Sequence, residues 1–182
     1  MNLPNKISMF RVVLVPVLVV FYYLTVELTN DLYAFFLAPI FIVASLTDFL
    51  DGYIARSRNL VTVFGKFIDP LADKLIVMAA LIIMNALGMI PIWVTIVILS
   101  REFIVTGIRL VAVGDGKVIA ASKLGKYKTA VTMVGLVMML AFPYWMMLAD
   151  IGIYVVYVGV VLTIVSGVDY FNKNKEIILK SI

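Results

Sequence analysis

Six mostly apolar stretches, each long enough to cross a bilayer as a helix, constrain this chain more than any other feature. They cover roughly residues 8–27, 33–57, 63–87, 91–113, 126–147 and 151–171. A spanning helix needs about 20 predominantly apolar residues. The chain is 64% hydrophobic and 14% charged, whereas soluble domains carry roughly 45–50% apolar and about 25% charged residues. The excess must face lipid. The sequence therefore predicts an all-α integral membrane protein: a six-transmembrane-helix bundle forming a single domain over residues 1–182.

The basic residues near the ends of these stretches and in the connections indicate the orientation of the bundle. They gather near the N-terminus, around the second and fourth connections and in the C-terminal tail, at Lys6, Arg11, Arg56, Arg58, Lys66, Arg109, Lys117, Lys123, Lys126, Lys128, Lys173, Lys175 and Lys180. The other three connections contain neither Lys nor Arg. Because Lys and Arg favour cytoplasmic loops, both termini are expected in the cytoplasm, with Met1–Ser8 lying along the inner membrane surface. This arrangement also explains the net charge of +4 without a nucleic-acid partner.

The chain contains no cysteine and no histidine, and these absences restrict its chemistry. Disulfides, thiolate nucleophiles, Cys/His zinc sites and histidine bases are excluded. A general base must be Asp, Glu, Lys or Tyr. Any metal must be held by oxygen ligands, which favours Mg²⁺, Mn²⁺ or Ca²⁺.

Four aspartates lie inside the second and third apolar stretches, at Asp48, Asp51, Asp69 and Asp73. Each ionisable group at membrane depth costs about 2.5–3.5 kcal/mol on insertion scales, so four facing lipid would cost on the order of 10 kcal/mol. They are therefore expected to share a polar cavity or a bound cation. A single aspartate such as Asp48 could instead be a packing hydrogen-bonder or a proton relay, but four at this spacing favour a functional site.

Helical spacing gathers these aspartates on two faces. One face of the second stretch carries Asp48, Asp51, Gly52 and Ala55. One face of the third carries Gly65, Asp69 and Asp73. Residues three, four or seven apart share a helical face, and a short connection makes the two helices antiparallel neighbours. The carboxylates are thus expected to converge beside small residues that leave space for a ligand. Because four like charges cannot stay ionised together without cations, two divalent metals are expected between them, an arrangement that suits phosphoryl displacement.

The expected site lies in the cytoplasmic half of the membrane. At 1.5 Å per residue, Asp48 is roughly 12 Å from the cytoplasmic end of its helix. A lipid headgroup could reach it from the side and a water-soluble partner from the cytoplasm. An ion-coupled transporter, the alternative from another functional class, would spread its acidic residues across the membrane depth. The confinement to one half favours an enzyme.

The arrangement of these residues resembles the signature of the CDP-alcohol phosphotransferases. Eight positions across 26 residues match it, in the pattern Asp48-x-x-Asp51-Gly52-x-x-Ala55-Arg56, eight residues, then Gly65-x-x-x-Asp69-x-x-x-Asp73. Three further segments extend the resemblance, at Asn2–Ser8, Ser100–Phe103 and Gly125–Thr129. With these segments, the chain is most similar to bacterial members that transfer the phosphatidyl group of CDP-diacylglycerol to glycerol 3-phosphate.

The resemblance implies a multi-pass homodimer in the cytoplasmic membrane, with two divalent metals, Mg²⁺ by preference or Mn²⁺, and an active site facing the cytoplasm. It implies that Asp48, Asp51 and Asp69 bind metal, with Asp73 completing the second metal site and acting as the base toward the acceptor hydroxyl. It also implies nucleotide binding by Asp51, Gly52, Ala55, Arg56, Gly65 and Asp69.

The acceptor glycerol 3-phosphate is a dianion and needs cations of its own. Arginine suits bidentate phosphate binding and lysine acts as a mobile point charge. We expect Arg109 and Lys126 to be the main phosphate ligands, assisted by Arg101, Lys123 and Lys128. An acceptor such as serine, inositol phosphate or phosphatidylglycerol is the alternative within the family.

Structural interpretations of the same cations remain open. Lys123, Lys126 and Lys128 could be anchors at the inner surface or attract anionic lipid. Arg109 could snorkel to the interface. Arg101 lies next to Glu102 and could form a structural pair. Glu102 could instead pair with Lys74.

Overall fold

A computed structural model describes residues 2–27, 32–57, 62–114, 123–141 and 144–180. Within these ranges, no side chain is described at 3–4, 25, 27, 32–34, 48–57, 63, 66–67, 111, 113–114, 123 and 176–180. The described chain is all-helical. Its six helices are α1 (Leu3–Glu27), α2 (Leu32–Ser57), α3 (Val63–Ala86), α4 (Ile92–Gly114), α5 (Lys123–Leu140) and α6 (Met146–Lys180).

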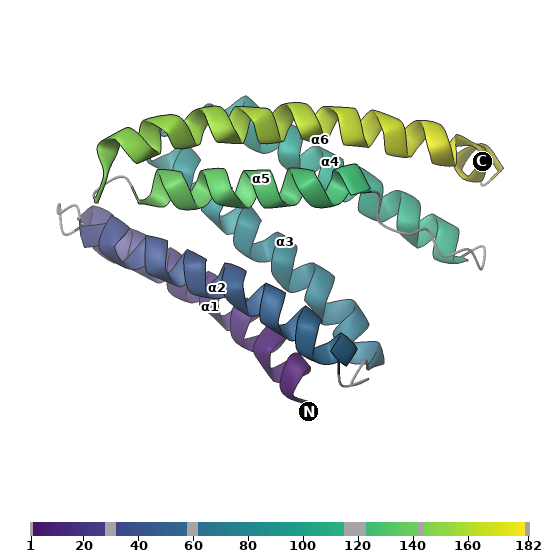
Figure 1. Cartoon of the computed structure of the whole chain (residues 1–182), viewed down its shortest axis with the longest axis horizontal. Helices are drawn as coiled ribbons and strands as arrows, with labels where there is room; N and C mark the ends of the chain where they lie inside the picture. The colour runs from purple at the N-terminus through teal and green to yellow at the C-terminus, as the bar shows by residue number, and fades with distance from the viewer. Residues whose placement is uncertain (1, 28–31, 58–61, 115–122, 142–143, 181–182) are drawn as a thin grey trace.

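The helices form a bundle in which the chain reverses direction from each helix to the next (Figure 1). Helices α2, α4 and α6 end toward the right of the view, whereas α1, α3 and α5 end toward the left. The helix pairs with the most extensive contacts are α5 with α6, α1 with α2, α1 with α3, and α4 with α6. Helix α3 crosses between the α1–α2 pair and the α5–α6 pair (Figure 1), so it contacts both halves of the bundle.

One apolar core holds these helices together. Its fully buried side chains come from all six helices and include Leu18, Phe41, Ile76, Met84, Val94, Leu136 and Val156. A second, smaller cluster joins α4 to α6 through Val105, Ile108 and Tyr170. The second cluster lies close to the polar side chains described below, because Tyr170 also contacts Arg109.

Helix α3, which carries two of the four aspartates, has well-defined ends. The hydroxyl of Thr62 caps its first turn by accepting the backbone N–H of Gly65 at 2.9 Å. A side-chain oxygen at this position satisfies one of the unpaired N–H groups of a helix start. Beyond its C-terminal end, Gly88 turns the chain toward α4 with φ +70°, a conformation that glycine adopts without steric cost.

The first helix begins earlier than expected. The sequence suggested a separate surface segment over Met1–Ser8, whereas α1 continues without a break from Leu3 to Glu27. Pro4 is compatible with this start, because proline is well tolerated in the first helical turn, where its missing N–H has no intrahelical partner. As a result, Asn5 and Ser8 are buried against the rest of the bundle.

The fifth and sixth helices also differ from their expected bounds. Helix α5 ends at Leu140 rather than near 147, and α6 starts at Met146 and reaches Lys180. Pro143 offers a reason in the sequence, because proline has no N–H and disfavours a helical residue before it. At the other end, the polar residues after Phe171 suggested an end near 171, yet α6 continues for 35 residues in all.

Helices α5 and α6 approach closely at glycines. A Cβ added at Gly135 would lie 2.7 Å from Val156 Cγ2 and 2.9 Å from Val156 N. One added at Gly159 would lie 2.5 Å from Thr132 Oγ1. Small residues that let helix backbones approach are typical of helix pairs in membranes.

The outer surface of the bundle is apolar. Large hydrophobic side chains are exposed on every helix, among them Val13, Val43, Ile82, Ile96, Val134 and Tyr154. Two described stretches, Asn5–Leu24 and Met146–Lys175, have the length and composition of membrane-crossing helices. Exposed apolar surface of this extent indicates contact with lipid.

Candidate functional site

Asp69 and Asp73 lie one turn apart on α3 and face α1. Gly65, one turn before Asp69, is buried at this contact. A Cβ at Gly65 would lie 2.8 Å from Asn5 Oδ1 and 3.7 Å from Asp69 Oδ2. The glycine therefore allows α1 to approach α3 beside the first aspartate.

Three polar side chains of α1 contact this part of α3. The Asn5 amide donates to the Thr62 hydroxyl at 3.0 Å, and that hydroxyl lies 3.1 Å from Asn5 Oδ1. Ser8 donates to Asp69 Oδ1 at 2.5 Å. Further along, Arg11 Nη1 forms an ion pair with Asp73 Oδ1.

The α2 half of the expected site is described only in its backbone. Helix α2 runs unbroken to Ser57, so its motif residues keep the helical spacing that puts the two aspartates and the small residues on one face. The side chains of Asp48, Asp51, Gly52, Ala55 and Arg56 lie outside the described residues. The side chain of Lys123 does too.

The donor set on α3 fits a hard divalent cation. Carboxylate oxygens are the ligands that Mg²⁺ and Mn²⁺ prefer, and the Asp73 side chain is 38% exposed. Among the side chains that the structure describes, no group of three or more acidic residues could hold a metal. The α3 face thus supplies two carboxylates, and any further ligand must come from elsewhere, as the two aspartates of α2 would provide.

A second polar group joins α4, α5 and α6 around Glu102. The Glu102 carboxylate pairs with Lys128 of α5 and with Arg101 Nη1 at 3.2 Å. Arg101 Nη2 also donates to the Ser166 hydroxyl of α6 at 3.2 Å. Lys128 is almost fully buried. Two of the five expected phosphate ligands, Arg101 and Lys128, therefore share a carboxylate.

Two more cations adjoin this group. Lys74 of α3 donates to the hydroxyl of Thr106 rather than to Glu102. Arg109 Nε donates to the Tyr170 hydroxyl at 3.3 Å, with its guanidinium 5.6 Å from the Tyr170 ring centre. The remaining expected ligand, Lys126, has an exposed side chain on α5.

Lys74 connects the acidic and basic groups. It follows Asp73 in the chain and lies within electrostatic range of Asp73, Arg101 and Arg109. Lys128 in turn interacts electrostatically with Arg101 and Lys74. The expected metal-binding face of α3 and the expected anion-binding cations thus belong to one continuous polar region.

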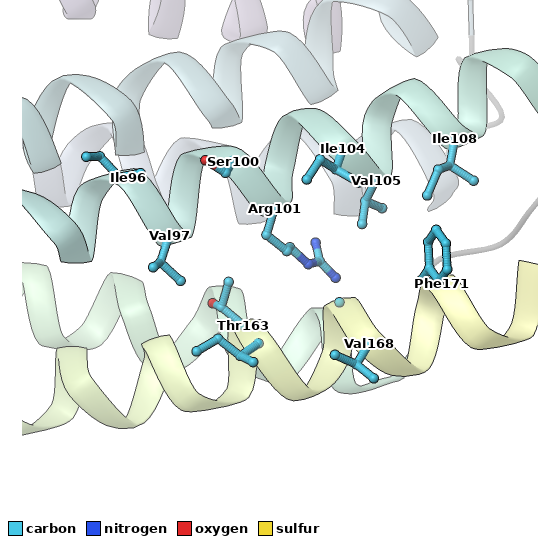
Figure 2. Close-up of a pocket in the computed structure, with 12 residues that line it drawn as sticks. Ile96, Val97, Ser100, Arg101, Ile104, Val105, Ile108, Thr163, Val168 and Phe171 are labelled. Carbon is cyan, nitrogen blue, oxygen red and sulfur yellow. The ribbon is translucent and has the colours of Figure 1, made fainter. Parts of the chain in front are cut away.

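An open apolar groove of about 460 Å³ runs between α4 and α6 on the outer side of this region. Figure 2 shows Arg101 extending from α4 toward α6 within it, among Val97, Val105, Thr163 and Val168. Arg101 Nε is buried and has no hydrogen-bond partner among the described atoms. The charge of Arg101 therefore lies at the boundary between the apolar groove and the polar group.

Several residues of this region escaped the sequence-based prediction. Arg11 was interpreted only as an orientation signal, and Asn5 and Ser8 only as parts of a resembling segment. Their spacing of three residues, at positions 5, 8 and 11, on a mostly apolar helix was a usable signal for one polar face. The contacts of Thr106 and Tyr170 had no such signal, because they join separate helices.

Known proteins resemble this chain along nearly its whole length. The family model for CDP-alcohol phosphatidyltransferase matches residues 1–165. A Bacillus subtilis protein named CDP-diacylglycerol–glycerol-3-phosphate 3-phosphatidyltransferase is 44% identical, with 96% of each chain covered.

Two further relatives come from other bacteria. A Haemophilus influenzae protein of the same name is 36% identical, covering 100% of this chain and 97% of its own. A Mycobacterium tuberculosis protein named probable phosphatidylglycerophosphate synthase is 39% identical, covering 93% of this chain and 79% of its own.

Proposed function

Because the chain belongs to the CDP-alcohol phosphatidyltransferase family, we propose that it transfers the phosphatidyl group of CDP-diacylglycerol to glycerol 3-phosphate. The products are phosphatidylglycerophosphate and CMP. The observation that carries this proposal is the contact between the two polar groups: Lys74, next to Asp73 on α3, donates to Thr106 of α4, whose hydroxyl donates to the backbone carbonyl of Glu102 at 2.7 Å. A CDP-lipid needs carboxylates that hold metal, and a phosphorylated acceptor needs cations next to them.

The four aspartates hold the metal in this proposal. Asp48, Asp51 and Asp69 would bind metal, and Asp73 would complete the second metal site. These aspartates would hold two divalent cations, Mg²⁺ or alternatively Mn²⁺, which would supply the positive charge that a CDP-lipid pyrophosphate needs in a displacement reaction. The exposure of Asp73 supports this role, because 38% of its side chain is exposed although its partner Arg11 is fully buried.

The small residues of the motif make space for the nucleotide. Gly52 and Ala55 of α2, together with Gly65 of α3, would leave room for the cytidine nucleotide, and Arg56 would contact its phosphates. Gly65 has a second role that the structure supports, since any side chain there would meet Asn5 and disturb the approach of α1 to Asp69. Asp51 and Asp69 contribute to the same nucleotide site.

Asp73 also takes the proton from the acceptor hydroxyl as that oxygen attacks the lipid-side phosphorus. General-base catalysis of this kind contributes typically about 10²–10⁴-fold. The position of Asp73 supports this role, because Lys74 next to it donates to Thr106 in the cationic region proposed for the acceptor phosphate. CMP leaves on the opposite side of the phosphorus.

The acceptor phosphate is held chiefly by Arg109 and Lys126, with Arg101, Lys123 and Lys128 assisting. Charge supports this division. Of the cations described in this region, Arg101 and Lys128 pair with Glu102, whereas Lys74 and Arg109 donate to the hydroxyls of Thr106 and Tyr170. A bound dianion would offset the remaining positive charge. Because Arg101 and Lys128 already pair with Glu102, we assign them an assisting role, in which they orient the site more than they bind the phosphate directly.

The protein acts as a multi-pass homodimer in the cytoplasmic membrane, with both termini and the active site on the cytoplasmic side. The alternating directions of the six helices and their apolar outer surface support this placement (Figure 1). Both substrates then meet at one membrane face.

An acceptor panel tests the proposal. Purified protein in lipid is incubated with CDP-diacylglycerol, Mg²⁺ and one of glycerol 3-phosphate, serine, inositol phosphate or phosphatidylglycerol, and CMP release is measured. We expect release with glycerol 3-phosphate alone. CMP release with another acceptor instead would show that the protein catalyses a different reaction of the same family. No release with any acceptor would favour a transporter.

A further inference from the structure

Asn5, Ser8 and Arg11 form a polar ladder on α1 that the proposed reaction does not yet use. The three side chains contact, in order, the cap of α3, Asp69 and Asp73. Residues spaced by three follow one face of a helix. The ladder therefore tracks the same face of α3 that presents the two carboxylates.

Arg11 is the charged member of the ladder, and its burial is unusual. Its side chain is 0% exposed and lies on a helix whose residues are mostly apolar. A guanidinium remains charged in proteins, and a buried charge must be paired. The ion pair with Asp73 meets that requirement.

The two partners differ in accessibility. Arg11 is completely buried, whereas 38% of the Asp73 side chain is exposed. Arg11 thus approaches the carboxylate from inside the bundle and leaves part of it accessible. A charge-assisted contact of this kind fixes a carboxylate in orientation as well as adding attraction.

We propose that Arg11 is a positioning residue: it holds Asp73 from the buried side and supplies the positive charge that the aspartate cluster lacks until divalent cations bind. Ser8 orients Asp69 in the same way through a hydrogen bond, without adding charge. This inference rests on the proposed metal site. It adds that α1 sets both the geometry of the α3 carboxylates and the strength with which they attract metal.

Removing Arg11 should strengthen Mg²⁺ binding but slow turnover, and these opposite changes make the inference testable. Without Arg11 the aspartates repel one another more strongly, so the metal-free protein is destabilised while the attraction for Mg²⁺ increases. At the same time Asp73 loses its fixed orientation, so turnover falls. A residue with a merely structural role would lower turnover without improving Mg²⁺ binding.

The experiment compares wild type with Arg11→Ala and Arg11→Lys as full-length protein in lipid. Thermal unfolding is recorded in EDTA and across a Mg²⁺ titration, and CMP release is measured against Mg²⁺ concentration. For Arg11→Ala we expect a larger Mg²⁺-induced rise in Tm than in wild type. The half-saturating Mg²⁺ concentration should fall on the order of tenfold, because a neighbouring positive charge is removed. The kcat should fall about 10²-fold through misplacement of the base.

Arg11→Lys retains the charge and should restore the wild-type Mg²⁺ dependence. Lys6→Ala is the matched control, because it removes one positive charge from an exposed position on the same helix and should change neither quantity. An unchanged or higher half-saturating Mg²⁺ concentration in Arg11→Ala would overturn the inference.

A double variant keeps the test decisive if Arg11→Ala does not fold. Asp73→Asn alone removes the negative charge that Arg11 contacts on α3, so Arg11→Ala/Asp73→Asn should have a higher Tm in EDTA than Asp73→Asn. A lower Tm in the double variant would contradict the pairing. If the wild-type Tm does not respond to Mg²⁺ at all, the proposed metal site fails. If wild type responds and Arg11→Ala responds equally, only the role of Arg11 fails.

Discussion

Lys128 of α5 and Glu102 of α4 form an ion pair in the interior of the helix bundle. Arg101 adds a second cation to the same carboxylate at 3.2 Å. Glu102 therefore orders two of the cations expected at the acceptor phosphate. Loss of the Glu102 charge should therefore lower the stability of the protein more than it alters the catalytic steps.

Glu102→Gln should reduce the free energy of unfolding by about 3 kcal/mol, because breaking a buried pair leaves uncompensated charge. Thermal unfolding in lipid measures this loss. Asp169→Asn is the matched control. It breaks an ion pair between Asp169 and Lys173, whose side chain is 69% exposed, and exposed pairs contribute roughly 1 kcal/mol or less. Equal losses in the two variants would contradict an organising role for Glu102.

Arg109→Ala should raise the KM for glycerol 3-phosphate by about 10–100-fold, because a hydrogen bond to a charged group contributes roughly 1.5–3 kcal/mol. The KM for CDP-diacylglycerol should change little. Steady-state CMP release with each substrate varied in turn measures both constants. Tyr170→Phe removes only the hydroxyl partner of Arg109 and should have a much smaller effect. Equal rises for both substrates would exclude Arg109 from the acceptor site.

Asp73→Asn should bind CDP nucleotides but turn over at least about 10²-fold more slowly, as expected for loss of a general base. Nucleotide binding is measured by titration and turnover by CMP release. A variant with near-normal kcat would remove Asp73 from the catalytic role.

Gly65→Ala should destabilise the protein by about 1–3 kcal/mol, because overpacking a close contact forces neighbours to move. The added methyl group would approach Asn5 Oδ1 to 2.8 Å and Thr62 Oγ1 to 3.1 Å. Gly107→Ala is the matched control on α4, where nothing lies within 4 Å of the new Cβ. It should be neutral or stabilising, by about 0.5–1 kcal/mol, since alanine favours a helix. Similar Tm values for the two variants would contradict the close contact at Gly65.

The sequence allowed the helices to be predicted well, because apolar length and turn residues are local properties. Six helices were expected and the described chain contains six, with α3 at Val63–Ala86 against an expected 63–87. The family was also predictable, since the aspartate motif lies within one helix–connection–helix unit and the match to the family model confirms it. The roles of the motif residues and the crossing of the membrane by all six helices stay predictions.

The partners of the charged residues were not predictable in the same way. Glu102 was considered a possible partner of Lys74, but it pairs with Arg101 and Lys128, and Lys74 contacts Thr106. These choices depend on how far one helix slides and rotates against another, which spacing within a single helix does not specify. Arg11 illustrates the same limit, because its partner lies 62 residues further along the chain.

Counting bound Mn²⁺ by electron paramagnetic resonance tests the central claim most directly, namely that carboxylates of α2 and α3 together hold divalent cations. Wild-type protein in lipid, titrated with Mn²⁺ and CDP-diacylglycerol, should bind two ions per chain, and Asp48→Asn and Asp69→Asn should each bind fewer. A wild-type protein that binds no Mn²⁺, or variants that bind as many ions as wild type, would contradict the account.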